Sequence, residues 1–499
     1  MKKLKKIAAI VGAVTVALSS SFLFTSCGNA EKKEVLRIYN WEDYICNVNE
    51  LDEENPEEYV YEDLVAKFEE KYNCTVEYST FGTNENMYNE IKINPGSYDL
   101  VCPSDYMIMK MIKEDMCEPF SDDFKTNSSY AQNVSPYIQN IFDENGWSDY
   151  AIGYMWGTMG FMYNPECSET VKDDVRSWTV LEQEKYQNKS TLKDSVRDTY
   201  FYALACIFQD ELKDLAEKFE SEELSTQEYN VAINEIMNRT DEDTVEKARL
   251  YLRSVKKNIY GFEVDSGKND MITGKININF CWSGDAAFGI YEAAEENDFT
   301  LSYSIPDLVS NIWFDGWVIP KGGNVSLAEK FLDFISEPEN AMMNMDYIGY
   351  TSVIAGDEIY ENWVLDSYEA SETDGTLAEL LESKEVQEYD VSYFFTSDEN
   401  EVENYKFYAY ASDIDGSLTA QYPSSYIVAR CAVMQFFEEE ANNRINMMWE
   451  DVKGAEIPVA AVVFIAIVIV VSGGAYTVTK FGRDWFRSKP KKGYYKVEK

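Results

Sequence analysis

The apolar positions between residues 34 and 104 alternate between the two-residue period of strands and the 3.6-residue period of helices. The pattern predicts strands at 35–41, 74–81 and 98–104 and helices at 61–72 and 84–93. In the first of these helices, Leu64, Val65, Phe68 and Tyr72 fall on one face. This alternation predicts an α/β fold with a parallel sheet, in which ligands bind beyond the C-terminal ends of the strands.

The rest of the chain up to residue 455 continues this alternation, with exceptions that are acidic and have no clear period. A helix is predicted at 327–345 and a closing segment at 432–453. Three acidic stretches, at 46–60, 209–247 and 357–420, are predicted to be irregular surface insertions.

Both ends of the chain carry membrane signals. Lysines followed by an apolar run from Ile7 to Phe24 predict a secretory leader, and "LFTSCGN" resembles a bacterial lipoprotein box in which Cys27 is lipidated. Near the other end, the uncharged residues 457–476 have the length of a transmembrane helix, and the basic tail 477–499 places the C-terminus in the cytoplasm. An uncleaved N-terminal anchor and a buried core helix are the alternatives, and no LPxTG motif precedes the apolar run to indicate a cell-wall sorting tail.

The segment between these ends is strongly acidic. Residues 28–479 carry 87 acidic and 32 basic residues. Such a charge repels nucleic acid and attracts cations, although most of it must be solvated surface. The chain has no histidine, which excludes Ser-His-Asp and Cys-His nucleophiles and HExxH zinc sites. Eight cysteines remain after Cys27 without a CxxC pair, so no metal site or cofactor is predicted, while disulfide pairing stays open.

Aromatic and acidic residues recur together where predicted strands end. "NWEDY" follows the first strand, "CWSGD" gives Trp282 and Asp285, "IWFDG" gives Trp313 and Asp315, and "KDSVRD" places Arg197 and Asp198 at a helix start. Each cluster alone has an ordinary explanation, because a tryptophan is more often core and an aspartate that opens a helix is more often a cap. Their recurrence at strand ends instead indicates one shared crevice.

The order of these motifs resembles a known family. "YNWEDYI", "YDLVCPSDY", "YMWGTMGFMYN", "WSGDAAF", "WFDGWVIP" and "IGYTS" are similar, in this order, to segments of the spermidine/putrescine-binding proteins of bacterial polyamine ABC importers, which have the type II periplasmic-binding fold. The resemblance extends from about Val35 to Lys453. It implies two lobes, one at about 34–150 and 316–349 and the other at about 151–315 and 350–455, within a solute-binding domain at 28–455.

The resemblance also implies which residues bind the ligand. They are the residues that match the family's aromatic box, its acids and its polar contacts: Trp41, Asp43, Tyr44, Ser104, Tyr106, Asp198, Trp282, Asp285, Trp313, Asp315, Tyr350 and Gln435. Asp198 stands where the family has Glu. Ser195 stands where some spermidine binders have a second Asp, which places triamine binding in doubt.

The residues themselves agree with a cationic, partly apolar ligand. Carboxylates pair with ammonium groups, and aromatic faces cover methylene groups with a cation–π gain of about 0.5–2 kcal/mol each. We therefore expect a non-enzymatic binding protein on the outer face of the cell membrane that delivers polyamines to an ABC permease and its ATPase. The alternatives are a binder of betaine or choline and a membrane-tethered sensor.

Overall fold

The computed structural model of the chain describes residues 33–51, 59–297, 299–371 and 377–454. The chain divides into two compact units, Met1–Met448 and Trp449–Lys499. Cys27 with the predicted leader, the predicted helix at 457–476 and the tail at 477–499 lie outside the described residues. Within the described ranges, no helix has both the length and the apolar character that crossing a membrane requires.

A mixed twelve-stranded sheet forms the centre of the first unit. Its main path is β4 (Thr75–Phe81), β1 (Val35–Trp41), β5 (Leu100–Val101), β12 (Ser310–Pro320), β7 (Ala151–Tyr163), β10 (Ile278–Trp282), β8 (Ser190–Lys193) and β9 (Gly261–Glu263). Four short strands pair outside this path: β6 (Cys117–Glu118) and β16 (Cys431–Ala432) with β12, and β11 (Ser302–Ser304) and β13 (Thr351–Ser352) with β7. Strand β1 pairs in parallel with β4 and β5, as predicted.

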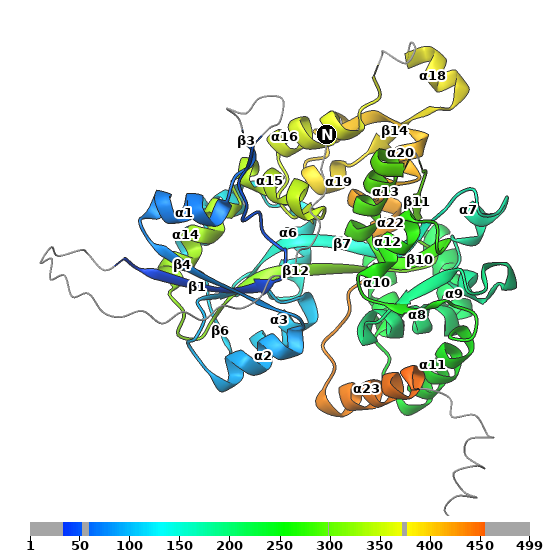
Figure 1. Cartoon of the computed structure of the whole chain (residues 1–499), viewed down its shortest axis with the longest axis horizontal. Coiled ribbons are helices and arrows are strands. Elements are labelled where there is room, and N and C mark those ends of the chain that lie inside the picture. The colour runs from blue at the N-terminus through cyan, green and yellow to red at the C-terminus, as the bar shows by residue number, and fades with distance from the viewer. Residues whose placement is uncertain (1–32, 52–58, 298, 372–376, 455–499) are drawn as a thin grey trace, which may run out of the picture. The chain divides into compact units, whose positions relative to one another are not determined.

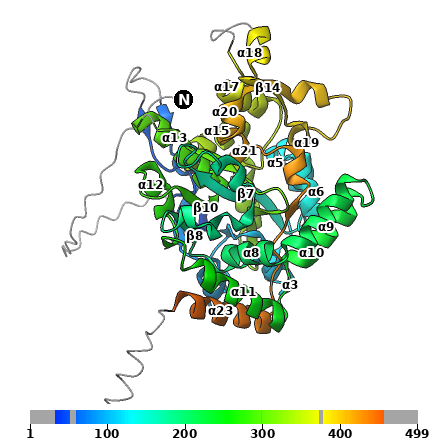
Figure 2. The ribbon, with the colours of Figure 1, turned by 90° about the vertical axis from the view of Figure 1, so that its right-hand side faces the viewer.

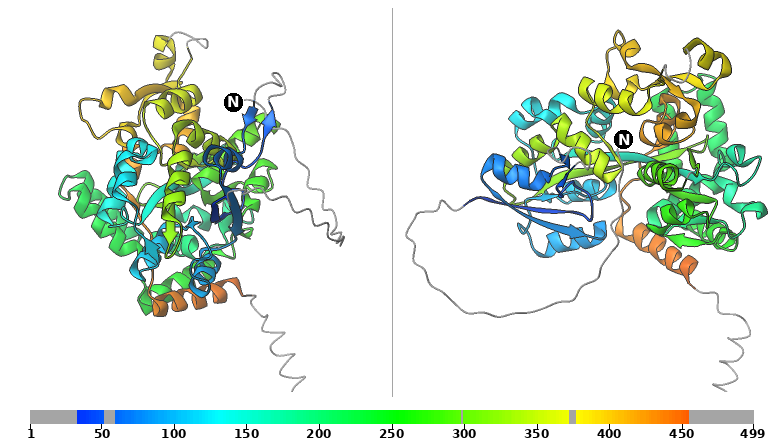
Figure 3. Two further views of the ribbon diagram at one scale, coloured as in Figure 1. Left: turned by 90° about the vertical axis from the view of Figure 1, so that its left-hand side faces the viewer. Right: turned by 45° about the horizontal axis from the view of Figure 1, so that its top comes forward.

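The two longest strands of the sheet, β7 and β12, join its two ends (Figure 1). They are antiparallel to each other, so the sheet is mixed rather than parallel. The first part of β7 pairs with β12, and its last five residues, Met159 to Tyr163, pair with β10. The right-hand view of Figure 3 shows the dark blue β1 at one end of these strands and green helices at the other, and β10 and β8 follow β7 in the strand order. The predicted lobe boundaries remain a prediction.

Helices cover both faces of the β4–β1–β5 end. Figure 1 shows α1 (Leu64–Tyr72) and α14 (Val325–Ile335) on one side, and α2 (Asn84–Ile93) and α3 (Asp105–Lys113) on the other. Further short helices complete this end: α4 (Asp122–Asn127), α5 (Ser129–Asn133), α6 (Pro136–Glu144) and α15 (Pro338–Ile348). The prediction of a single helix at 327–345 is wrong, because Pro338 lacks the N–H that a continuing helix needs and instead begins α15.

Around the β10–β8–β9 end, Figure 2 shows α8 (Val196–Ile207) and α11 (Glu242–Val255) on the opposite side of β8 from α13 (Ser283–Asn297). The other helices here are α7 (Val171–Asp174), η1 (Trp178–Glu182), η2 (Glu184–Tyr186), α9 (Gln209–Glu220), α10 (Thr226–Met237) and α12 (Ser266–Ile272). The acidic stretch 209–247 is therefore helical, not irregular. Its acids lie on exposed faces, while Leu212, Tyr229 and Ile233 are buried.

The acidic stretch 357–420 also contributes to the core, contrary to the prediction. Phe394, Phe395, Tyr405 and Phe407 are buried there. Three of them, Phe395, Tyr405 and Phe407, pack against the ring of Tyr360, and Phe394 packs against Phe395. Its elements are α16 (Asp357–Ile359), η3 (Tyr360–Leu365), α17 (Asp366–Tyr368), α18 (Leu377–Ser383), β14 (Val386–Asp390), α19 (Ser392–Phe395), η5 (Val402–Tyr405), β15 (Lys406–Tyr410), α20 (Ala411–Ile414) and α21 (Ser417–Gln421).

Three further elements complete the described chain: the hairpin β2 (Glu50–Leu51) and β3 (Tyr59–Tyr61), the helix α22 (Ser425–Val428) and the closing helix α23 (Glu439–Lys453). Strand β2 and the first two residues of β3 fall within the predicted insertion 46–60, where the pattern suggested no regular structure. The eight cysteines of the described residues are all free thiols, seven of them buried.

Candidate ligand-binding site

The turn that follows β1 supplies the first group of predicted site residues. Tyr44 is buried, and its backbone oxygen accepts hydrogen bonds from Asn40 Nδ2 at 3.2 Å and from the Tyr154 hydroxyl at 2.9 Å. Trp41 ends β1 and packs against Phe81 with ring centroids 4.5 Å apart. These contacts fix the aromatic rings at the C-terminal end of a parallel strand, where the sequence pattern predicted a ligand.

Asp315 lies at the centre of the site and accepts two hydrogen bonds from the predicted residues. The Tyr44 hydroxyl donates to Asp315 Oδ2 at 2.8 Å, and Ser104 Oγ donates to Oδ1 at 2.7 Å. Strand β12 changes its register with β7 between Asp315 and Gly316, and this irregularity lies at the carboxylate. Three motifs that are far apart in sequence therefore meet at one acid.

The pKa of Asp315 is raised to about 6. Burial is the largest cause, and the negative charge of Asp198 raises the pKa further. The hydrogen bonds from Ser104 and Tyr44 act in the opposite direction, because they stabilise the carboxylate. Asp315 is thus a partly buried acid without a cationic partner of its own.

Three aromatic rings continue from Asp315 along the site. Tyr350 contacts Tyr44 edge to face at 6.0 Å between centroids and Trp313 at 5.6 Å. Two glycines allow these rings to approach the backbone closely: a Cβ at Gly157 would lie 2.6 Å from the Trp313 ring, and a Cβ at Gly284 would lie 2.5 Å from the Tyr350 ring. The positions of Tyr350 and Trp313 therefore depend on the absence of side chains behind them.

Asp198 supplies a second buried acid from the β8 side of the sheet. It is the third residue of α8 and is 6% exposed. Its backbone N–H donates a hydrogen bond to Oγ of Ser195, the residue that caps the helix, at 3.5 Å. Burial raises its pKa, although hydrogen bonds from Ser195 and Trp282 and the charges of Lys193 and Arg197 limit the rise. Asp198 and Asp315 are close enough for the charge of Asp198 to raise the pKa of Asp315.

Asp285 differs from these two acids because it already has cationic partners. Lys193 Nζ donates to its Oδ2 at 2.9 Å, Lys268 Nζ is 3.5 Å from its Oδ1, and the Tyr350 hydroxyl donates to Oδ1 at 3.2 Å. Burial acts to raise the pKa of Asp285, but the charges of Lys193 and Lys268 outweigh it and leave the pKa lowered. No pattern in the sequence predicts this pairing.

Arg197 connects two other predicted residues. Its guanidinium lies 4.8 Å from the centroid of the Tyr106 ring and donates to the backbone oxygen of Gln435. The Tyr106 hydroxyl donates to Glu85 Oε1 at 3.2 Å. Arg197 was part of the "KDSVRD" cluster, but sequence reasoning did not include it among the ligand-binding residues.

A further acid at the site was missed by the sequence reasoning. Asp105, the first residue of α3, is 2% exposed, and its Oδ2 has no hydrogen-bond partner among the described residues. Burial raises its pKa to about 7, a rise that Asp315 increases and Arg197 reduces. The residue lies between Ser104 and Tyr106, but at a helix start an aspartate is more often a cap, so its burial could not be predicted.

Asp43 is the predicted site residue that the structure leaves exposed. It has a left-handed backbone conformation, with a φ of 52°, in the turn after β1. Its negative charge contributes to raising the pKa of Tyr78 and Tyr347, which places it beside the aromatic residues of this turn. Asp43 therefore lies beside the site rather than among its buried acids.

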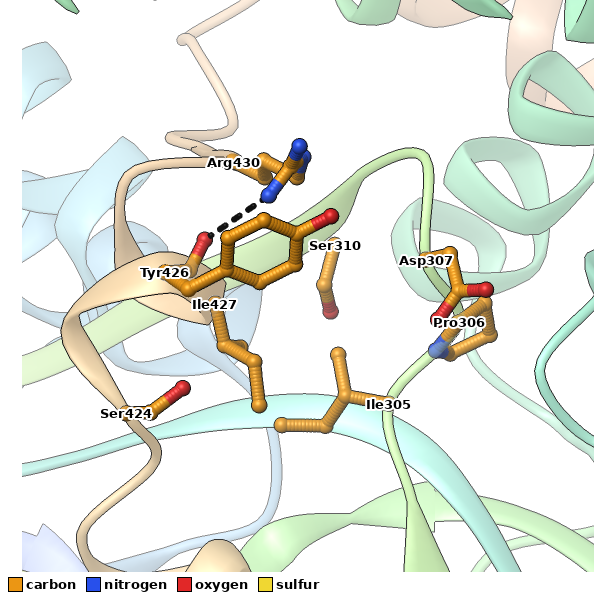
Figure 4. A pocket seen from close by; sticks show the side chains of 8 residues that line it. All are labelled: Ile305, Pro306, Asp307, Ser310, Ser424, Tyr426, Ile427 and Arg430. Carbon is orange, nitrogen blue, oxygen red and sulfur yellow. Dashed lines mark hydrogen bonds between the residues drawn. The ribbon is translucent and has the colours of Figure 1, made fainter. Parts of the chain in front are cut away.

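A separate cavity of about 190 Å³ lies away from these residues, between the loop after β11 and α22 (Figure 4). Its buried charge is Arg430, which lies over the Tyr426 ring at 3.4 Å and pairs with Glu220 at 2.8 Å. The acid that lines it, Asp307, pairs with Arg176 at 3.0 Å. The acid that lines this cavity is therefore already paired, unlike Asp315 and Asp198.

Among the residues that the structure describes, no group of three or more Cys, Asp or Glu side chains is placed to hold a metal ion. The candidate site consists of acids and aromatic rings from the turn after β1, the middle of β12 and the start of α8. Such a site fits a protein that binds an organic solute.

The chain belongs to the bacterial extracellular solute-binding proteins, a family whose model matches residues 63–358. This family is a class of binding proteins rather than of enzymes. The chain is 28% identical over 353 residues to the spermidine/putrescine-binding periplasmic protein of Escherichia coli, which covers 70% of this chain and 84% of that protein. It is 25% identical over 342 residues to a putrescine-binding periplasmic protein of Pseudomonas aeruginosa, with 66% and 80% covered.

Solved structures show the same fold. The substrate-binding protein of a spermidine/putrescine ABC transporter from Streptococcus pneumoniae, in complex with calcium and HEPES, is 26% identical, with a TM-score of 0.53 over 84% of this chain and 99% of that chain. A lipoprotein of Treponema pallidum has a TM-score of 0.54 at 18% identity, with the same coverage. The periplasmic-binding-protein fold predicted from the motifs is therefore confirmed.

Proposed function

We propose that this protein captures polyamines, putrescine or spermidine, outside the cell and delivers them to the permease of an ABC importer. The observation that carries the proposal is a pair of acids without a salt-bridge partner among the described residues: Asp315, partly buried in β12, and Asp198, buried at the start of α8. A diammonium ligand supplies one positive charge to each acid. Charge-assisted hydrogen bonds of this kind are about twice as strong as neutral ones.

The aromatic rings complete the recognition of such a ligand. Tyr44, Tyr350 and Trp313 form a continuous edge-to-face series next to Asp315, and Trp282 donates to Asp198. Their faces cover the methylene groups between two ammonium groups. Trp41, Ser104, Tyr106 and Gln435 border this arrangement. The names of the related proteins, which are spermidine/putrescine-binding and putrescine-binding proteins, support the same ligand class.

Ligand binding is proposed to close the two lobes predicted from the resemblance, with the hinge in β7 and β12. A closed form docks on the permease, which with its ATPase consists of other chains. Closure requires that the ligand bind the closed form more tightly than the open form. Contacts with Asp315 of β12 and with Asp198 of α8 would provide that difference.

The proposal includes attachment to the membrane. Lipid on Cys27 and a transmembrane helix at 457–476 would hold the protein at both ends, with its bulk outside and its basic tail in the cytoplasm. Two attachments would keep the binding domain next to the permease.

A thermal-shift panel on the detergent-solubilised full chain tests the ligand class. Putrescine, cadaverine, spermidine and spermine are compared with choline and betaine. A ligand at 100 times its dissociation constant adds about 2.7 kcal/mol of stability. If only choline or betaine stabilises the protein, the aromatic rings bind a single quaternary ammonium group. If the polyamine recovered after incubation has been chemically converted, the protein is an enzyme.

A further inference from the structure

Lys193 is a buried lysine that occupies a complete binding site for an ammonium group. It ends β8, it is 2% exposed, and its Nζ donates to the Val264 oxygen at 2.6 Å and to Asp285 Oδ2 at 2.9 Å. The same Nζ is 3.5 Å from Glu263 Oε1 and 4.2 Å from the centroid of the Trp282 ring. Carboxylates and an aromatic face are the groups that recognise the ammonium of an amine ligand.

The charges around Lys193 are balanced within the protein. Two lysines, Lys193 and Lys268, face two acids, Asp285 and Glu263. Glu263 is further held by Asn279 Nδ2 at 2.9 Å and by the backbone N–H of Gly267 at 2.8 Å. Asp285 therefore has no negative charge left to offer a ligand. A second positive charge placed against it would meet the lysine at close range.

Asp198 and Asp315 differ from Asp285 because their negative charges are not paired. Neither carboxylate has a lysine or arginine within 4.0 Å among the described residues. Lys193 also acts on Asp198, since its charge lowers the pKa of that acid. The lysine is thus next to the ligand position proposed above and lies at its Trp282 end.

We propose that Lys193 determines the specificity of the site by acting as a built-in ammonium. It fills the position at Trp282 and Asp285 that a third amine would use, so the site binds a diamine through Asp198 and Asp315 and disfavours a triamine. This inference rests on the proposed polyamine function and narrows its ligand to a diamine such as putrescine.

Lys193→Met tests the inference, because methionine keeps an unbranched apolar chain and removes the charge. Asp285 then becomes available to a third ammonium. We expect the ratio of spermidine to putrescine affinity to rise about 30-fold or more, the size of effect that a buried charge pair has on binding. The affinities are measured by titration calorimetry on the full chain in detergent.

Lys193→Met leaves Asp285 and Glu263 without the charge of Lys193. A variant that also removes one negative charge is therefore measured beside it. Lys193→Met with Glu263→Gln removes one positive and one negative charge and leaves Asp285 in place, and the same rise in the ratio is expected. Lys193→Met with Asp285→Asn removes the acid as well, and the rise should disappear. Lys268→Met is the matched control: it deletes an outer lysine that contacts Asp285 but not Trp282, and the ratio should change by less than about threefold.

The outcomes separate this inference from the proposed function. Wild-type protein that binds no polyamine overturns both. A different result overturns only the role of Lys193. In that result the wild-type protein binds a polyamine, and Lys193→Met, alone or with Glu263→Gln, keeps the wild-type ratio of spermidine to putrescine affinity. A wild type that already prefers spermidine by more than tenfold also overturns it.

Discussion

Replacing Asp315 by Asn removes the central charge of the site with little change in shape. The amide oxygen still accepts the hydrogen bond that Ser104 Oγ gives at 2.7 Å. The amide nitrogen, however, cannot accept the bond that the Tyr44 hydroxyl gives at 2.8 Å. The change therefore tests the charge and one hydrogen bond, with the backbone and the aromatic rings unchanged.

The expected loss of affinity is large, and the expected loss of stability is small. An ammonium group left buried without its carboxylate costs about 2–5 kcal/mol, so putrescine binding should weaken about 30-fold or more, mostly through a faster off-rate. In the free protein, the rise of the Asp315 pKa from 3.8 to about 6 means that its charge costs roughly 3 kcal/mol at pH 7. Losing that cost offsets the lost Tyr44 bond, worth about 1–3 kcal/mol, so unfolding free energy should change by less than about 2 kcal/mol.

Titration calorimetry and denaturant unfolding of the full chain measure the two quantities. Asp346→Asn is the control, because the Tyr61 hydroxyl donates to Asp346 at 3.0 Å and this pair takes no part in the proposed site. The control should keep its putrescine affinity. Asp198→Asn should lose affinity as Asp315→Asn does, since each acid is expected to hold a different ammonium. Near-normal putrescine affinity in both variants would refute the diammonium site.

Three further predictions follow from other features. Gly284→Ala should weaken ligand binding about tenfold or more, because the new Cβ would lie 2.5 Å from the Tyr350 ring; calorimetry that shows unchanged affinity would contradict this role of Tyr350. The pKa of Asp105 is higher in the folded state, at about 7, than its ordinary value of 3.8, so the folded protein takes up a proton as the pH falls and gains stability. Unfolding free energy should thus gain about 1 kcal/mol between pH 7.5 and pH 6 relative to Asp105→Asn, and equal pH slopes would contradict it. Finally, Cys27→Ala and deletion of residues 456–499 should each leave the protein in the membrane fraction, whereas release by either change alone would rule out attachment at both ends.

Much of the fold could be predicted because periodicity directly reflects which face of an element is buried. The strand at 35–41 and the helix at 84–93 have the predicted bounds in the structure. The break between α14 and α15 could also have been predicted, since Pro338 stands at the beginning of the second helix. The stretch 357–420 could not, because its buried residues, aromatic and aliphatic, lie in short elements without a sustained period.

The candidate site was predictable to a lesser degree. That Tyr44, Ser104 and Asp315 meet follows from motifs placed at strand ends and from the family resemblance. Which acids have internal partners depends on packing between residues far apart in sequence: Lys193 and Asp285 are 92 positions apart. Asp43 is exposed in a turn where its φ is 52°, and no pattern of residue types indicates that exposure.

The directions of the pKa shifts separate the acids that lack a cation from the acid that already has one. Burial acts to raise the pKa of Asp105, Asp198, Asp315 and Asp285 alike. In the first three the pKa remains raised, because hydrogen bonds and distant positive charges do not offset burial. In Asp285 it is lowered, because Lys193 is 2.9 Å away. A ligand with two ammonium groups would do for Asp198 and Asp315 what Lys193 does for Asp285, and its binding should lower both pKa values and become weaker as the pH falls below about 6.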